Sequence, residues 1–392
     1  MDKIKYLDGL RGLAAFVVVL SHFAVVFYPA LYTADVKEVR FVSQLDLVIA
    51  GTPLNVLYNG NFAVCIFFIL SGYVLSYKFF KDKNPEALAS GAFRRYFRLL
   101  IPVLFTNFIV FLFMKNSLFF NVQAGTITNS TWWFSEMWIF KAGFVGMLRE
   151  SFFGVFILEE CTYNPALWTM TYEFFGSFLV FITAAIIGRY KHRYVLYFIL
   201  CCVLFQTYYL AFIVGLILSD LTFNGYLEVF ESKAAKLILV GLLLGSYPAG
   251  MDVTNTIYTF FNFNFIQDTP MFFHILGSLC IMLALLNSKK LQRFFSTRPL
   301  AFLGKISFSM YLIHLCVIGT FSSFLFIELL RYFDYNKSFA ITFGLSLILI
   351  FTVSILINKC VDEKGVLLSH KMYQYVKKRW WHTERIKSSS SL

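Results

Sequence analysis

Charged residues are scarce in this sequence: Asp, Glu, Lys and Arg make up 14% of its 392 positions, whereas 58% are hydrophobic. A soluble domain has roughly a quarter of its residues charged, so a water-soluble globular fold is excluded. No polar interval is long enough to hold a separate soluble domain. The net charge of +12 does not indicate nucleic acid as a partner, because Lys and Arg in cytoplasmic loops beside anionic lipid explain it.

Metal and nucleotide motifs are also missing. The seven cysteines lie mostly in apolar runs and form no CxxC pair, so we interpret them as small buried residues rather than a disulfide or zinc framework. The histidines and carboxylates are scattered, and no Gly-rich nucleotide loop is present. We therefore predict no metal site and no permanently bound cofactor.

Long apolar runs dominate the chain instead. About ten could cross a hydrocarbon core, which predicts an all-α, polytopic transmembrane helical bundle. The fifth and sixth are the weakest, because together they are long for one span and short for two. The ten runs are residues 13–29, 62–79, 99–114, 167–187, 194–206, 208–221, 234–247, 271–286, 301–327 and 339–357.

Basic residues give an orientation. With the N-terminus inside and ten crossings, 27 of the 34 Lys and Arg residues fall on the inner side, as cytoplasmic loops require. We predict a multi-pass protein of the cell membrane, or of the inner membrane in a bacterium, with both termini cytoplasmic. Residues 1–365 would form one membrane domain, and residues 366–392 a basic cytoplasmic tail that touches lipid before fraying.

The outer loop between residues 115 and 165 is long enough to have a structure of its own. Within it, residues 142–158 are apolar but interrupted by Arg149 and Glu150. This pattern suits an interfacial or re-entrant helix better than a full span.

The first apolar run contains two ionisable residues, Arg11 and His22. Eleven steps along an α-helix return to within about 20° of the same face and rise about 16 Å. One face would thus present a cation near the cytoplasmic edge and an imidazole near mid-membrane. Ionisable residues inside a span mark functional sites, and neutral His can take a proton from a hydroxyl. The alternative is a histidine that hydrogen-bonds between helices and an Arg that anchors the interface.

Glu173 follows Trp168 at the outer entrance of the fourth span. A carboxylate inside an apolar helix needs a partner. It could orient His22 or bind an acceptor hydroxyl, or it could pair with an Arg of another helix for structural reasons.

Arg94, Arg95 and Arg98 lie together at the cytoplasmic start of the third span. Guanidinium groups bind phosphate through two hydrogen bonds, so this cluster and Arg11 could hold the phosphates of coenzyme A. An ordinary positive-inside anchor is the other explanation.

Two further segments place polar residues in apolar runs. Ser71 and Tyr73 in the second span flank Gly72, a pattern typical of close helix packing. In the ninth span, residues 307–314 include two serines, Tyr311 and His314, and helix-to-helix hydrogen bonding is the simpler interpretation there. His274 is isolated and is interpreted in the same way.

Five segments in this order resemble the signature segments of acyltransferase family 3: YLDGLRGLAAFVVVLSHF, FFILSGYVLS, FRRYFRLLIP, NPALWTMTYEF and LGKISFSMYLIHL. The resemblance extends from residue 6 to about residue 357. It implies a ten-helix membrane enzyme that passes an acyl group, usually acetyl from cytoplasmic acetyl-CoA, to a hydroxyl on a sugar or other acceptor at the outer face.

The resemblance also implies which residues occupy the motif positions of the family. The Arg-x10-His pattern of the family matches Arg11 and His22, and its Arg-x-x-Arg pattern matches Arg95 and Arg98. The segment that runs from Trp168 to Glu173 matches as well, but Phe174 stands where many bacterial members have a second acidic residue.

Our leading hypothesis is an O-acyltransferase in which His22 acts as general base or accepts the acyl group transiently. Glu173 would orient it, and Arg11, Arg95 and Arg98 would hold the phosphates of acyl-CoA. The acceptor, a carbohydrate or another alcohol, would contact Trp168, Ser71 and Tyr73. The alternative is a carrier or flippase for a small polar or lipid-linked solute, with His22 and Glu173 as a proton relay.

Overall fold

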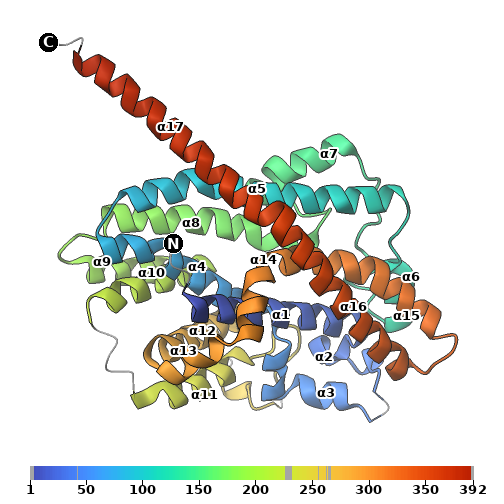
Figure 1. Ribbon diagram of the computed structural model, residues 1–392. Helices are drawn as coiled ribbons and strands as arrows, with labels where there is room; N and C mark the ends of the chain where they lie inside the picture. Colours follow the sequence, from blue (N-terminus) through green and yellow to red (C-terminus); the bar gives the residue numbers. More distant parts are fainter. Residues whose placement is uncertain are drawn as a thin grey trace.

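The computed structural model describes residues 4–41, 43–225, 232–254, 256–261, 263 and 266–389, with side chains through Arg379. All regular elements in these ranges are helical (Figure 1). The α-helices are α1 (Lys5–Phe27), α2 (Ala30–Thr33), α3 (Leu45–Ala50), α4 (Gly60–Asp82), α5 (Glu86–Lys115), α6 (Asn121–Thr128), α7 (Phe144–Arg149), α8 (Thr169–Ile186), α9 (Arg193–Val203), α10 (Tyr209–Phe223), α11 (Ala234–Gly245), α12 (Thr269–Asn287), α13 (Lys289–Phe295), α14 (Arg298–Val317), α15 (Ser323–Leu329), α16 (Tyr335–Ile357) and α17 (Glu363–Ser389). Between them lie the 3₁₀ turns η1 (Val36–Glu38), η2 (Pro53–Leu57), η4 (Pro165–Trp168) and η6 (Thr259–Phe261) and the π-helical turns η3 (Glu150–Leu158), η7 (Ile318–Ser322) and η8 (Asn358–Asp362).

Seven helical segments in the described part of the chain are long and apolar enough to cross a membrane. They correspond to predicted spans one to four and eight to ten. The three remaining predicted spans coincide with shorter apolar helices, α9, α10 and α11. The prediction of an all-α bundle with several membrane helices is thus confirmed, while ten crossings and cytoplasmic termini stay predictions.

Glycine contacts bring α1 and α14 together. A Cβ atom on Gly12 would lie 2.3 Å from the backbone nitrogen of Gly304 in α14, and one on Gly9 would lie 1.9 Å from the carbonyl oxygen of Phe295, the last residue of α13. Only the absence of side chains permits this approach. Ten residues further along each helix, His22 and His314 also meet, so α1 and α14 run parallel and in register. Parallel packing is what the predicted topology requires of its first and ninth spans.

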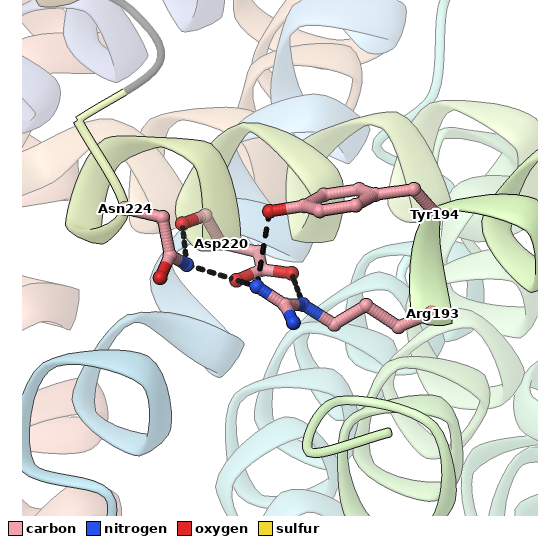
Figure 2. Close-up of polar contacts among 4 residues, drawn as sticks. All are labelled: Arg193, Tyr194, Asp220 and Asn224. Carbon is pink, nitrogen blue, oxygen red and sulfur yellow. Dashed lines mark hydrogen bonds and ion pairs between the residues drawn. The ribbon is translucent and has the colours of Figure 1, made fainter. Parts of the chain in front are cut away.

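The short helices α9 and α10 are joined by one buried polar contact (Figure 2). Arg193 Nε lies 2.6 Å from one oxygen of Asp220, and the guanidinium also donates to the other oxygen and to the Tyr194 hydroxyl. Asn224 donates to Asp220 from the next turn of α10. The carboxylate is fully buried, so these donors compensate the cost of removing its charge from water.

The long outer loop is helical for much of its length. Helix α7 continues into η3, and this segment lies lengthwise beside α5 (Figure 1). The Phe144 ring lies 5.9 Å from that of Phe111, and the Tyr96 hydroxyl donates to the carbonyl of Phe152 at 2.9 Å. The segment runs antiparallel along α5 rather than across its end, and the re-entrant or interfacial placement of residues 142–158 stays a prediction.

The last span is the start of a much longer helix. α16, η8 and α17 follow one another without a break, and α17 extends away from the bundle (Figure 1). Its first half packs antiparallel on α5, because the Tyr373 ring lies 5.8 Å from that of Phe93 and Lys377 pairs with Glu86. The segment predicted as a fraying tail from residue 366 is therefore helical to Ser389, and residues 390–392 lie outside the described range.

Candidate active site

His22 lies at the wall of a cavity of about 270 Å³. The cavity is bounded by the C-terminal half of α1, the N-terminus of α4 and the loops beyond them, at the end of α1 opposite Arg11. Most of its wall is aromatic or amide in character. The lining residues are Val18, Ser21, His22, Val25, Leu31, Tyr32, Asn55, Tyr58, Asn59, Gly60, Asn61, Val64, Trp132, Trp133, Trp168, Tyr208, Ala249 and Tyr311.

The described residues that line the cavity include no charged side chain. Their hydrogen-bonding groups are amides, hydroxyls, indole N–H groups and the His22 imidazole. A tyrosine hydroxyl is neutral near pH 7, and burial raises the pKa of the Tyr58 hydroxyl further above its ordinary value. Flat aromatic faces beside neutral donors and acceptors suit an uncharged ligand that has both apolar surface and hydroxyl groups.

Two groups contact the Nδ1 atom of the His22 imidazole. Its Nδ1 lies 2.8 Å from the carbonyl oxygen of Val18, one turn earlier in α1. The same Nδ1 lies 3.1 Å from Nε2 of His314 on α14. The ring of Trp133 lies 5.5 Å from the His22 ring. Since both known contacts use Nδ1, the other ring nitrogen, Nε2, is the atom left for chemistry at the cavity.

The three predicted phosphate-binding arginines do gather in space. The charges of Arg98 and Arg11 both act on Arg95, which lies in the α5 turn that faces α8. Arg11 forms an ion pair with Asp8 at 2.9 Å and keeps part of its side chain exposed, and Arg98 is exposed. We call Arg11, Arg95 and Arg98 the arginine cluster. Its members do not line the cavity at His22.

Glu173 lies in the arginine cluster and not against His22. Its carboxylate forms an ion pair with Arg95 and accepts a hydrogen bond of 2.7 Å from the Ser71 hydroxyl. Both charged side chains are nearly buried, with 9% and 12% of their surface exposed. The described contacts of Glu173 are therefore those of the structural alternative, a pair with an Arg of another helix. The same pair occupies Arg95, and Asp8 pairs with Arg11, which leaves the exposed Arg98 as the member of the arginine cluster most available to a phosphate.

The three predicted acceptor-binding residues do not lie in one site. Trp168, at the start of α8, lines the cavity. Ser71 instead contacts Glu173, and Tyr73 is buried with its hydroxyl directed at Thr222 of α10. Gly72 between them lets α10 approach, because a Cβ atom there would lie 2.0 Å from the Phe212 carbonyl oxygen. Ser71 and Tyr73 thus have the contacts of the packing interpretation.

Several cavity residues were not singled out in the sequence. Trp132 and Trp133 lie in the outer loop, and Asn55 and Asn59 precede α4. No periodic pattern marks these positions, because they come from irregular segments that meet only in the fold. Asn59 is held by the carbonyl of Tyr247 and by His274, which gives His274 a structural partner. In the described part of the chain, no cluster of His, Cys, Asp and Glu is arranged to hold a metal ion.

The fold and the site define an integral membrane protein with one imidazole at an aromatic cavity and a cationic cluster at the far end of the same helix. Comparison with known proteins gives its class, a membrane acyltransferase. The chain belongs to acyltransferase family 3, whose model, described as an acyltransferase domain, matches residues 4–359.

Curated relatives agree with this assignment. The chain is 22% identical to acyltransferase clz18 of Cochliobolus lunatus, in an alignment that covers 91% of this chain and 95% of that protein. It is 23% identical to O-acetyltransferase PaAT-1 of Phomopsis amygdali, with 98% and 86% covered. No solved structure matches the chain.

Proposed function

We propose that this protein transfers an acetyl group from acetyl-CoA to a hydroxyl of an uncharged acceptor, a carbohydrate or another alcohol, that binds in the cavity at His22. One observation carries the proposal: the imidazole that the family pattern marks lies on the wall of an aromatic, uncharged cavity. The name of the Phomopsis relative, an O-acetyltransferase, supports acetyl as the transferred group.

The chemical step uses the Nε2 atom of His22. In one route Nε2 takes the proton of the acceptor hydroxyl while the oxygen attacks the thioester carbonyl. The carbon–sulfur bond then breaks, the proton passes to the thiolate, and the products are an ester and coenzyme A. In the other route Nε2 itself attacks the thioester carbonyl, the carbon–sulfur bond breaks, and coenzyme A leaves as its thiolate. The acceptor hydroxyl then attacks the acyl group on the imidazole, Nε2 is released, and the hydroxyl proton neutralises the thiolate. Both routes need Nε2 unprotonated at the start.

The donor would be held by Arg98, which is exposed, together with Arg11, which is partly exposed and pairs with Asp8. Their positive charges suit the phosphates of coenzyme A. Along α1, Arg11 and His22 are separated by about 16 Å, which requires an extended donor with its phosphates at one end and its thioester at the other. Coenzyme A has this shape.

The test of His22 is acetyl transfer by purified protein in vesicles, with labelled acetyl-CoA and a panel of neutral sugars and alcohols. His22→Ala should reduce transfer by about a hundredfold or more. His192→Ala, at the exposed N-cap of α9, is the matched control and should transfer at the wild-type rate. Transfer by His22→Ala at the wild-type rate would remove His22 from the mechanism.

The test of the donor site is binding of coenzyme A. Arg98→Ala should weaken binding by roughly tenfold, the value of one charge-assisted contact. Lys290→Ala, an exposed basic residue of α13, is the control for nonspecific charge loss. The carrier hypothesis predicts no binding of coenzyme A to the wild type, so the same titration separates the two functions.

A further inference from the structure

His314 lies directly behind His22 and has no access to the cavity. It is fully buried in α14 and is absent from the cavity wall. Its Nε2 lies 3.1 Å from Nδ1 of His22, and its own Nδ1 lies 3.2 Å from the carbonyl oxygen of Met310. The two rings therefore form a chain that begins at a backbone carbonyl and ends at the cavity.

The positions of the carbonyl groups assign the protons in this chain. A ring nitrogen at hydrogen-bond distance from a carbonyl oxygen must donate, because the oxygen can only accept. The Nδ1 of His22 therefore holds a proton, which points to the Val18 carbonyl and is shared with His314. Likewise the Nδ1 of His314 donates to Met310. The Nε2 atom of His314 is then unprotonated, and its lone pair accepts the hydrogen bond from His22. The Nε2 atom of His22 is also left unprotonated.

We propose that His314 is a positioning residue for acyl transfer. It shares with the Val18 carbonyl the hydrogen bond that Nδ1 of His22 donates. This second acceptor reinforces the tautomer in which the cavity-facing Nε2 is free, and it binds His22 more strongly when His22 becomes positively charged. The inference rests on the proposed function, since it assigns His22 as the reacting group. His314 itself does not touch the substrates.

The packing of the two helices explains how the pair is held. Gly12 and Gly304 bring the backbones of α1 and α14 into contact, and the histidines follow ten residues later on both helices. The Tyr311 side chain, one turn before His314, is fixed by hydrogen bonds to Thr169 and to the carbonyl of Ala166. These contacts fix the backbones that carry the two histidines, and rotation of either ring would break the contact between His22 and His314.

Kinetics of four variants test the role of His314. His314→Gln places an amide oxygen near the former Nε2 position, so it should accept the same hydrogen bond and keep kcat within about threefold of wild type. His314→Asn and His314→Leu remove the acceptor on α14 and leave His22 with the Val18 carbonyl alone. Each should lower kcat by about ten- to hundredfold with the KM for both substrates changed by less than about twofold. His370→Leu, on the exposed face of α17, is the control substitution.

A merely structural role gives a different result. If His314 were only structural, its replacement would lower the unfolding temperature and kcat together, and His314→Gln would have no higher kcat than His314→Asn. Equal kcat values for the Gln and Asn variants, when both fold, would overturn the proposal. Gel filtration and thermal unfolding of each variant check the fold, and the comparison of Gln with Asn still decides if the Leu variant does not fold.

A second measurement does not depend on turnover. Nitrogen NMR of histidine-labelled wild type should show His22 protonated at Nδ1 and unprotonated at Nε2, and His314→Leu should disturb the His22 signal. Protonation of His22 at Nε2 instead would overturn the proposal. If the wild type transfers no acetyl group to any acceptor, the proposed function fails, and this spectrum alone decides whether the hydrogen bond exists.

Discussion

The pair of Arg95 and Glu173 allows a direct test of whether Glu173 is structural or catalytic. Both side chains are nearly buried, with 9% and 12% of their surface exposed, so solvent screens them little. Removal of one partner of a buried ion pair leaves an uncompensated charge and costs about 3–5 kcal/mol. At about 2 °C per kcal/mol for a large chain, Glu173→Gln should lower the unfolding temperature by roughly 6–10 °C.

The double variant Arg95→Met with Glu173→Gln removes both charges. The remaining amide can still accept the hydrogen bond that Ser71 donates to the carboxylate in the wild type. Replacement of a buried ion pair by neutral groups is often neutral for stability, so the double variant should recover most of the loss seen in Glu173→Gln.

The assay is thermal unfolding in detergent together with acetyl transfer. A double variant that is stable and active shows that Glu173 acts through Arg95 and not on the substrates. A double variant that is stable but inactive gives one of the two residues a chemical role. The reasoning is refuted if Glu173→Gln unfolds at the wild-type temperature, because the ion pair would then contribute nothing to the fold.

Three further outcomes follow from the structure. Gly12→Val should destabilise the protein by about 1–3 kcal/mol or more, because even a Cβ atom would lie 2.3 Å from the nitrogen of Gly304. Thermal unfolding measures this loss, and an unchanged unfolding temperature would contradict the close approach of the two helices. Asp220→Asn should cost about 1.5–3 kcal/mol through its weakened bond to Arg193, measured in the same way, and a neutral result means that the pair does not join α9 to α10. Burial raises the pKa of the Cys161 thiol to about 11, so less thiolate is present near neutrality. The rate of iodoacetamide labelling should therefore rise roughly tenfold per pH unit between pH 8 and 10. A labelling rate that levels off below pH 9 contradicts this pKa shift.

Much of the helical architecture was predictable because the hydrocarbon core imposes it. A segment inside lipid must satisfy all its backbone groups internally and expose apolar side chains, so composition alone indicates each long helix. The predicted first span, residues 13–29, overlaps α1 (Lys5–Phe27) for this reason, although the helix begins eight residues earlier. The weak fifth and sixth runs correspond to α9 and α10, whose stability also depends on the buried contact of Arg193 with Asp220.

The candidate site was only partly predictable. His22 and Trp168 do line one cavity, in agreement with the motif pattern. Glu173 was assigned either to His22 or the acceptor, or to an Arg of another helix, and in the structure it lies beside Arg95. The alternatives stayed open because sequence spacing fixes the face of one helix and not the partner helix that it meets. His314 was interpreted as a packing residue, since a single histidine in an apolar run gives no sign of a second histidine about 290 positions away.

The sequence by itself determined that the protein lies in a membrane, that its fold is helical and which family it belongs to. These properties depend on composition and on local patterns within single helices. It also fixed the common face of Arg11 and His22, which follows from helical geometry. Only the tertiary structure decided which side chains meet. The contact of His22 with His314, the burial of Glu173 against Arg95 and the aromatic cavity all arise where separate helices pack. That packing depends on close steric fit between distant segments, as at Gly12 and Gly304, which no local pattern specifies.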